Sequence, residues 1–305
     1  MRVAVEQRAL GRTGLVVGAL GLGGAELGYD NVPASQVDAM LGEALDLGIT
    51  VIDSAAAYRD SEAKIGAALR NRPRERFHLF TKCGPDWRPD ALARDIDESL
   101  RRLGTDHVDL LQLWAAPLDV LCRGDAAAVL EAAKQAGKAR LIGYSGDGPP
   151  AAYAVESEVF DVLQTSVNVA DQEAIELTLP GCAARGMGVI AKRPIANAAW
   201  RIGRPAENGH GDAYWDRLGY ADAYARRLER LDYPFLALPL GEAVACALRF
   251  TLAVPGVSVA IVGTTRPERL AENARAASGV MDAAAFDRIR ARWRERSDPS
   301  WVGQE

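Results

Sequence analysis

The sequence predicts an α/β protein, a single closed (β/α)8 barrel of the TIM-barrel type over residues 1–305. Eight short apolar runs alternate with longer segments of helical periodicity, which indicates a parallel sheet with right-handed crossovers. Most runs are continuously apolar, as expected for strands that are buried on both faces. The predicted strands are residues 20–23, 50–53, 78–82, 108–113, 139–145, 162–167, 188–193 and 259–263.

The main alternative to a barrel is an open, doubly wound sheet. Such a sheet normally carries a G-x-G-x-x-G turn between its first strand and a helix. The corresponding residues here are Gly21, Gly23 and Glu26, so the third glycine is missing. This difference favours the barrel, in which closure removes both sheet edges.

The helices are predicted between these strands. One has Ser35 as its N-cap, and another begins at Asp90 and ends before Gly104. Further helices are predicted over 125–137, 242–252 and 267–277. The inner face of the helix over 125–137 is predicted to hold Ala128, Val129, Ala132 and Ala133.

Composition excludes several classes of function. The formal net charge is −5, so no basic surface is expected for nucleic acid or an anionic membrane. Neither a secretion signal nor a run of the ~20 apolar residues that span a bilayer is present, so we expect a cytoplasmic protein. The dispersed cysteines argue against a metal site and indicate free, buried thiols. They are Cys83, Cys122, Cys182 and Cys246.

The segment 198–240 interrupts the regular alternation after the seventh strand. It lies on the face where barrel active sites are built, so an elaborated loop that covers the substrate is predicted there. The alternative is an ordinary connection with a helix over 216–231. Its aromatic and imidazole side chains are Trp200, His210, Tyr214, Trp215, Tyr220, Tyr224, Tyr233 and Phe235.

Three polar residues are the candidates for catalysis. Asp53 and Lys82 each end an apolar strand, and Tyr58 follows just beyond the second strand, so the three converge at the carboxyl-terminal mouth of a barrel. Reduction of a carbonyl builds negative charge on its oxygen. A tyrosine hydroxyl donates the required proton more readily when a nearby ammonium lowers its pKa. A buried ammonium needs a counter-ion, which Asp53 supplies.

The motifs around these residues resemble the aldo-keto reductase family over nearly the whole chain. The segments 8–15 and 18–24, which include Gly23 and Gly24, resemble the opening hairpin and first strand of that family. Asp53 and Tyr58, followed by a Ser-Glu pair, resemble its D-x-x-x-x-Y signature, and Lys82 matches its catalytic lysine.

The resemblance implies a nicotinamide dinucleotide site. Ser145 stands where the family carries a serine that contacts the nicotinamide amide, and Gln164 where a glutamine contacts the same group. Residues 261–273 are similar to the segment that holds the adenosine end and, usually, its 2′-phosphate. The contacts expected there are Gly263, Thr264, Thr265, Arg269, Glu272 and Asn273.

The same segment also has a physical interpretation of its own. A Gly-Thr-Thr turn that opens a helix presents free N–H groups and a positive dipole end to a phosphate. Arg269 and Arg266 add charge-assisted hydrogen bonds suited to a phosphomonoester. This combination predicts NADP(H) as the cofactor, whereas a plain capped helix is the alternative.

Two positions depart from the family's pattern. Trp114 stands where the family carries the histidine of its catalytic tetrad, and an indole N–H donates one hydrogen bond but cannot titrate. On the seventh strand many relatives carry an aromatic residue that stacks on the nicotinamide. In this sequence two alternatives are open. The aliphatic stems or the guanidinium of the basic residues at this position cover the nicotinamide ring, or their charged groups bind the pyrophosphate. The residues concerned are Lys192, Arg193, Pro194 and Ile195.

These residues together predict an NADPH-dependent oxidoreductase that reduces a small aldehyde, ketone or sugar-like carbonyl. Tyr58 is the predicted proton donor, Lys82 tunes it, Asp53 is the counter-ion and Trp114 forms a wall of the pocket. Trp87 is a second candidate for the pocket wall or a packing residue. The alternative function is a non-catalytic NADP(H)-binding regulatory barrel, because the tetrad histidine is replaced. The sequence makes no prediction of the oligomeric state.

Overall fold

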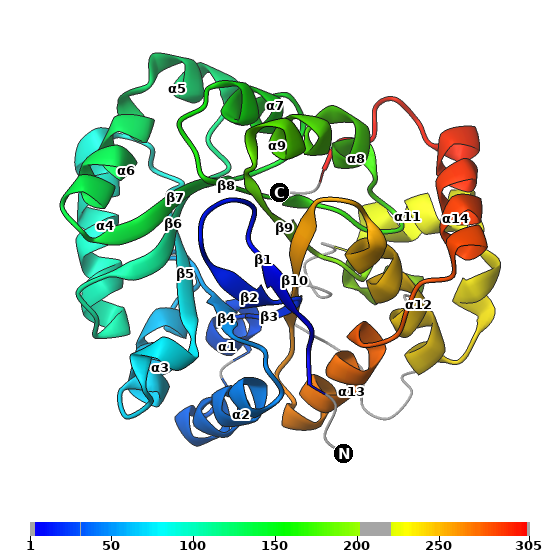
Figure 1. The fold of residues 1–305 in the computed structure, drawn as a ribbon, viewed down its shortest axis with the longest axis horizontal. Coiled ribbons are helices and arrows are strands. Elements are labelled where there is room, and N and C mark those ends of the chain that lie inside the picture. Colours follow the sequence, from blue (N-terminus) through cyan, green and yellow to red (C-terminus); the bar gives the residue numbers. More distant parts are fainter. Residues whose placement is uncertain (1–3, 31, 202–220, 304–305) are drawn as a thin grey trace.

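The computed structural model describes residues 4–30, 32–201 and 221–303. Eight parallel strands close into a barrel in the order β10-β3-β4-β5-β6-β7-β8-β9, and helices surround it (Figure 1). The predicted (β/α)8 fold is thereby confirmed. The barrel strands are β3 (Leu20–Gly23), β4 (Val51–Asp53), β5 (His78–Cys83), β6 (Val108–Trp114), β7 (Ala139–Ser145), β8 (Val162–Ser166), β9 (Gly188–Lys192) and β10 (Val257–Gly263).

Helices follow the strands and bury their apolar faces on the barrel wall. The α-helices are α1 (Ala25–Tyr29), α2 (Ala34–Asp46), α3 (Ser61–Leu69), α4 (Pro89–Leu103), α5 (Leu118–Arg123), α6 (Asp125–Gln135), α7 (Gly148–Glu156), α8 (Glu173–Leu177), α9 (Leu179–Arg185), α11 (Asp222–Leu231), α12 (Leu240–Ala253), α13 (Pro267–Ala277) and α14 (Ala283–Arg296). Short 3-10 turns are η1 (Arg74–Arg76), η2 (Ala196–Arg201) and η3 (Pro234–Ala237).

Each barrel strand lies within two residues of its predicted bounds. β9 ends at Lys192 instead of Arg193, because Arg193 adopts a left-handed conformation with φ of +53° that leaves the sheet. β10 begins at Val257, two residues earlier than predicted, where its pairing with Val189 of β9 starts.

Two details of the predicted helices are wrong. α2 begins at Ala34, so Ser35 lies inside its first turn and Pro33, with φ of −60°, is the residue that precedes the helix. α6 buries a different face from the predicted one, because Leu130 contributes more apolar area than any alanine of this helix. The buried residues of α6 are Ala126, Ala127, Leu130 and Ala133, whereas Ala128 and Ala132 are exposed and Val129 is half-buried.

A hairpin closes the amino-terminal end of the barrel. Its strands β1 (Gln7–Ala9) and β2 (Val16–Gly18) pair antiparallel, and it lies across the strands in Figure 1. Leu10 is fully buried and packs into the barrel interior against Gly188 at the start of β9. The interior cluster that joins hairpin and barrel consists of Leu10, Leu15, Val17, Val51, Phe80, Leu110, Leu141, Val162, Ile190, Val259 and Ile261.

The described part of the segment 198–240 is packed into the core. Tyr224 is fully buried and donates a hydrogen bond to Asp171 (3.2 Å), and Tyr233 is buried and donates to the Val169 carbonyl (3.0 Å). These residues serve packing, and α11 is described from Asp222 onward. His210, Tyr214, Trp215 and Tyr220, on which the prediction of a substrate-covering loop also rests, lie outside the described residues.

All four cysteines are free, but they are not all buried as predicted. Cys122 is exposed because α5 turns Val120 and Leu121 toward the core and Cys122 away from it. Within the described ranges, no helix is long and apolar enough to cross a membrane. The same ranges contain no group of three metal-ligating side chains.

Candidate active site

A buried ion pair lies at the carboxyl-terminal mouth of the barrel. Lys82 Nζ donates to Asp53 Oδ2 at 2.5 Å and to the Ser54 carbonyl at 2.8 Å. Both charged side chains are almost completely buried, with 2% and 6% of their area exposed. The adjacent strands β4 and β5 bring these two groups together, as the sequence predicts. A buried charge of this kind is tolerated because its partner neutralises it.

Tyr58 lies beside this ion pair. Its ring centre is 5.5 Å from Lys82 Nζ, and the ring is half-buried in the turn after β4. Gly28 of α1 makes room for this turn, because a Cβ at that position would lie 2.1 Å from the Tyr58 carbonyl oxygen. The phenol, the ammonium and the carboxylate therefore meet at one place.

The second oxygen of Asp53 is held by two glutamines. Gln112 Nε2 and Gln164 Nε2 donate to Asp53 Oδ1 at 3.2 and 3.3 Å, and Ser145 Oγ donates to Gln164 Oε1 at 3.0 Å. Gln164 and Ser145, predicted to face the nicotinamide, are thus connected to the carboxylate of Asp53. The whole chain of hydrogen bonds is buried, which fixes the orientation of Asp53.

Gln112 was not among the residues that sequence reasoning selected. The signal is its position inside the apolar β6, because a buried glutamine on a barrel strand must find hydrogen-bond partners. Its Nε2 has a partner in Asp53, whereas its Oε1 is buried without a partner among the described residues. Gln112 is therefore a positioning residue of this site.

Two tryptophans form the wall on the other side of Tyr58. The Trp114 ring meets the Tyr58 ring edge-on, with centres 5.8 Å apart and planes at 77°. Trp87 donates from its indole nitrogen to the Trp114 carbonyl at 2.9 Å, which connects the loop after β5 to the end of β6. Both tryptophans are half-buried.

The basic residue at the end of β9 is paired with a carboxylate. Lys192 Nζ lies 2.8 Å from Asp147 Oδ2, and Thr165 Oγ1 and the Ser166 N–H also donate to Asp147. Burial opposes ionisation of Asp147, but Lys192 and these donors hold its pKa below the usual range. Asp147, another residue that sequence reasoning missed, anchors the predicted cofactor residue Lys192. Arg193 follows in its left-handed conformation, and Pro194 and Ile195 turn toward η2.

The helix α13 has the predicted bounds 267–277, and Arg266 lies between it and the Gly-Thr-Thr turn after β10. α13 begins at Pro267, which has no N–H, and the Arg266 N–H donates to Thr264 Oγ1 at 3.1 Å. Arg269 is paired with Glu272 on the same helix, and Arg266 lies 3.9 Å from Glu268. Fewer backbone N–H groups are therefore free to bind a phosphate than the sequence predicts. The guanidinium groups carry most of the positive charge at the start of α13.

Glycines allow close approach between the first and last strands of the barrel. Gly23 pairs with Gly263 of β10 and with Asp53 of β4, and the Gly24 N–H donates to the Asp53 carbonyl at 2.8 Å. A Cβ at Gly263 would lie 2.0 Å from the carboxylate of Glu26, so this side chain rests directly on the glycine. Backbone without side chains at these positions is suited to an extended cofactor.

The donor set of the mouth fits a nicotinamide dinucleotide. Ser145 and Gln164 provide a hydroxyl and an amide on neighbouring strands, and Arg269 provides a guanidinium at the start of α13. The sequence pattern of the "Aldo/keto reductase family" matches residues 19–294. The chain belongs to the aldo/keto reductase family. Members of this family use nicotinamide cofactors, and the predicted membership is confirmed.

Several individual proteins support this membership. An L-galactose dehydrogenase of Arabidopsis thaliana is 33% identical over 217 residues, which cover 63% of this chain and 66% of that protein. A D-threo-aldose 1-dehydrogenase of a Pseudomonas species is 29% identical over 88% of this chain and 92% of its own. An NADH-specific methylglyoxal reductase of Escherichia coli is 29% identical over 61% of this aldo/keto reductase and 64% of that protein.

A solved structure shares the fold. The holo form of aldo-keto reductase AKR11C1 from Bacillus halodurans superposes with a TM-score of 0.77 at 24% identity. The superposition covers 94% of this aldo/keto reductase and 96% of that chain. The hairpin and the closed barrel are therefore those of an aldo/keto reductase.

Proposed function

We propose that this aldo/keto reductase is an NADPH-dependent oxidoreductase that reduces a small aldehyde, ketone or sugar-like carbonyl by hydride transfer. The observation that supports the proposal best is the buried Lys82–Asp53 ion pair with the Tyr58 ring 5.5 Å from the ammonium. A phenol beside a buried ammonium at the mouth of a barrel is suited to donate a proton to a developing oxyanion.

Each residue of the site has a definite part in this reaction. A nicotinamide cofactor, when bound, would supply the hydride for this reduction. Tyr58 donates its hydroxyl proton to the carbonyl oxygen, and Lys82 stabilises the phenolate that remains. Asp53 holds the ammonium in place, and Gln112 and Gln164 hold Asp53 through its second oxygen. Tyr58 is half-buried beside the ion pair.

Trp114 stands where we expect the family to carry the histidine of its catalytic tetrad, which would be the second polar group beside Tyr58. In the described part of the chain its indole N–H has no acceptor, so it can donate to the substrate oxygen beside Tyr58. An indole fills more volume than an imidazole, and the site therefore favours small or flat carbonyl compounds. Because tryptophan cannot titrate, the proton comes from Tyr58 alone.

The cofactor proposed is NADP(H), held at both of its ends. Ser145 and Gln164 would hold the nicotinamide amide, with the residues 192–195 beside the ring or pyrophosphate. Thr264, Thr265 and Arg269 would hold the 2′-phosphate, with Gly263 beneath and Glu272 and Asn273 at the adenine. This assignment requires that Arg269 leave Glu272 for the phosphate. The NADH specificity of the Escherichia coli relative makes the comparison of both cofactors necessary.

The experiment is a screen of aldehydes, ketones and sugars that follows the oxidation of NADPH and, in parallel, NADH. Tyr58→Phe is expected to reduce kcat at least a hundredfold, because the proton donor is lost, while cofactor binding is retained. Trp114→His is the matched variant and is expected to keep or raise activity. Absence of turnover across the panel, with tight NADPH binding, would favour the regulatory alternative, which the oxidoreductase names of the relatives do not support.

A further inference from the structure

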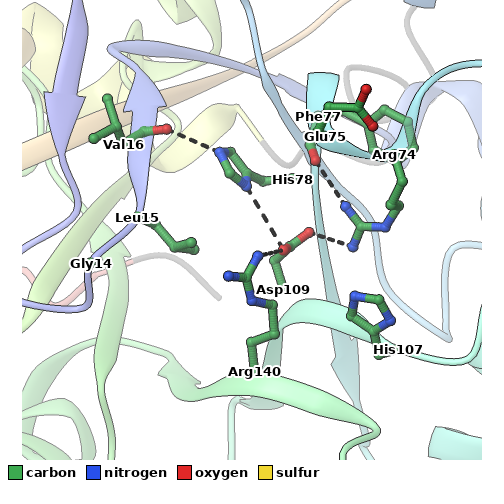
Figure 2. A pocket seen from close by; sticks show the side chains of 10 residues that line it. All are labelled: Gly14, Leu15, Val16, Arg74, Glu75, Phe77, His78, His107, Asp109 and Arg140. Atoms are coloured by element: carbon green, nitrogen blue, oxygen red, sulfur yellow. Dashed lines mark hydrogen bonds and ion pairs between the residues drawn. The ribbon is translucent and has the colours of Figure 1, made fainter.

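A second cavity lies at the opposite end of the barrel from the catalytic mouth. Its volume is about 540 Å³, within the range of small-molecule sites. It is bounded by the tip of the hairpin, including Leu15 and Val16, and by the amino-terminal parts of β5, β6 and β7 (Figure 2). His78, Asp109 and Arg140 line it from these three strands, whose other ends carry Lys82, Trp114 and Ser145. The cavity is therefore separate from the active site.

The charged groups of this cavity are organised around one buried carboxylate. Asp109 has no exposed side-chain area and accepts from Arg74 Nη2 at 2.6 Å, the Leu79 N–H at 2.8 Å and Arg140 Nη1 at 3.0 Å. Burial opposes its ionisation, but His78 and Arg74 outweigh this effect and hold its pKa well below the usual range. Asp109 is thus ionised and fully engaged, so it offers no further acceptor to the cavity.

Positive groups remain in excess after Asp109 is satisfied. Two guanidinium groups, of Arg74 and Arg140, face one buried carboxylate, and Glu75 is exposed with its carboxylate turned away from Asp109 in Figure 2. Among the described residues, Arg74 Nε is buried without an acceptor. Arg140 uses only Nη1 within the described ranges, so its Nε and Nη2 are available for a ligand.

Two imidazoles also line the cavity. His78 Nε2 lies 3.0 Å from the Val16 carbonyl and donates to it, because a carbonyl only accepts. His78 Nδ1 is buried and lies 3.8 Å from Asp109 Oδ1. His107 Nδ1 donates to Asp106, so the positive charge of the cavity comes from the two guanidinium groups.

The opposite wall of the cavity is apolar. Leu15 is buried at the tip of the hairpin, whereas Val16 exposes 57% of its surface, an unusual fraction for a large aliphatic residue on a strand. A ligand that places an oxyanion near Arg140 would therefore lay its other atoms on Leu15 and Val16. This arrangement is better suited to a carboxylate with a short hydrocarbon chain than to inorganic phosphate.

We propose that this cavity is a binding site for a small organic carboxylate at the amino-terminal end of the barrel. Arg140 binds the carboxylate, Arg74 supports it electrostatically, and the hairpin tip covers its hydrocarbon part. The ligand connects the hairpin to β6 and β7 and does not contact the catalytic residues.

The test is isothermal titration calorimetry of the full chain with butyrate, and with butanol and inorganic phosphate as comparison ligands. Butyrate is expected to bind, butanol not to bind, and phosphate to bind more weakly. Arg140→Gln is expected to weaken butyrate binding about tenfold, the effect of one charge-assisted hydrogen bond.

Two controls make the result specific. Arg94→Gln removes an exposed charge from the outer face of α4 and is expected to leave binding unchanged. Tyr58→Phe is also expected to leave it unchanged, because butyrate that bound at the catalytic mouth would respond to this variant. The proposal is overturned if butyrate does not bind, if phosphate or butanol binds as tightly, or if folded Arg140→Gln binds it normally. Circular dichroism verifies the folding of each variant.

Discussion

At the scale of single residues, the orientation of Asp53 depends on side chains from three other strands. Lys82 of β5 binds one of its oxygens, and Gln112 of β6 and Gln164 of β8 bind the other. Gln164 is itself held by Ser145, whereas Gln112 has an unpartnered Oε1 within the described chain. Burial of this unpartnered oxygen lowers the folding stability. Its presence is explained if the amide of Gln112 is needed to position Asp53.

Gln112→Leu tests this positioning role. The variant removes one donor from Asp53 and also removes the buried unpartnered oxygen, so we expect folding stability to change little. We expect kcat to fall about tenfold, the effect of one hydrogen bond to a charged group, with an unchanged KM for the cofactor. The pH dependence of kcat should also shift, because Asp53 influences Lys82 and Tyr58. An unaltered pH profile of kcat together with lower folding stability would indicate that Gln112 has a structural role only. Gln135→Leu, at the exposed end of α6, is the control.

Asp171 gives a prediction about pH and stability. Burial raises its pKa to about 7, Asp147 adds to this, and Arg227 and Tyr224 oppose it. Because the folded protein holds this proton more tightly than the unfolded chain, the contribution of Asp171 to stability is complete below its unfolded pKa. It is lost as pH rises toward 7, by up to about 1.4 kcal/mol per pH unit.

Urea unfolding of the wild type and Asp171→Asn at pH 5 and pH 8 measures this contribution. The free energy of unfolding of the wild type should fall, relative to that of the variant, between the two pH values. Among the other carboxylates, the pKa values of the buried Asp109 and Asp147 are lowered, so these two lose their contributions only in more acidic solution. The pKa of Glu173 is raised, but its contribution is common to the wild type and the variant. A difference between wild type and variant that is independent of pH would contradict the assignment.

The sequence predicts a place in the site for residues that their own strand or turn marks out. It does not predict one for residues whose role depends on a partner far away in the chain. Asp53 and Lys82 stand out because each ends an apolar run, and parallel strands bring such ends together. Gln112 and Asp147 acquire their roles from Asp53 and Lys192, which are 59 and 45 positions away in the chain. The face of α6 was ambiguous because alanines occupy both of its sides.

At the scale of elements, the proposed function assigns the choice of cofactor to α13. Arg269 lies in the first turn of this helix and is paired with Glu272, so a 2′-phosphate would have to compete with a carboxylate for the guanidinium. On the proposed function, Arg269→Gln should raise the KM for NADPH about tenfold and change the KM for NADH less than twofold, with kcat unchanged. Arg275→Gln, an exposed position on the same helix, is the matched control. Equal effects on both cofactors would show that Arg269 does not bind the 2′-phosphate.

At the scale of the whole molecule, segments from both ends of the chain are built into the barrel. Leu10 of the hairpin lies in the barrel interior at the amino-terminal end. Near the other end of the chain, the Val302 carbonyl accepts from Arg227 of α11, and Trp301 packs against Trp293 of α14. A closed sheet has no edge from which strands can separate one at a time, so these terminal segments should unfold together with the barrel.

We therefore expect one cooperative unfolding transition, consistent with a single domain over 1–305. Trp87 and Trp114 report on the mouth and Trp293 and Trp301 on the C-terminal segment, and all six tryptophans contribute to the fluorescence. Far-UV circular dichroism samples the helices. The two signals should share one urea midpoint, and NADPH at a hundred times its Kd should stabilise both by about 2.7 kcal/mol. Separate midpoints would mean that the hairpin or the C-terminal segment unfolds independently, because only a shared core makes distant probes respond together.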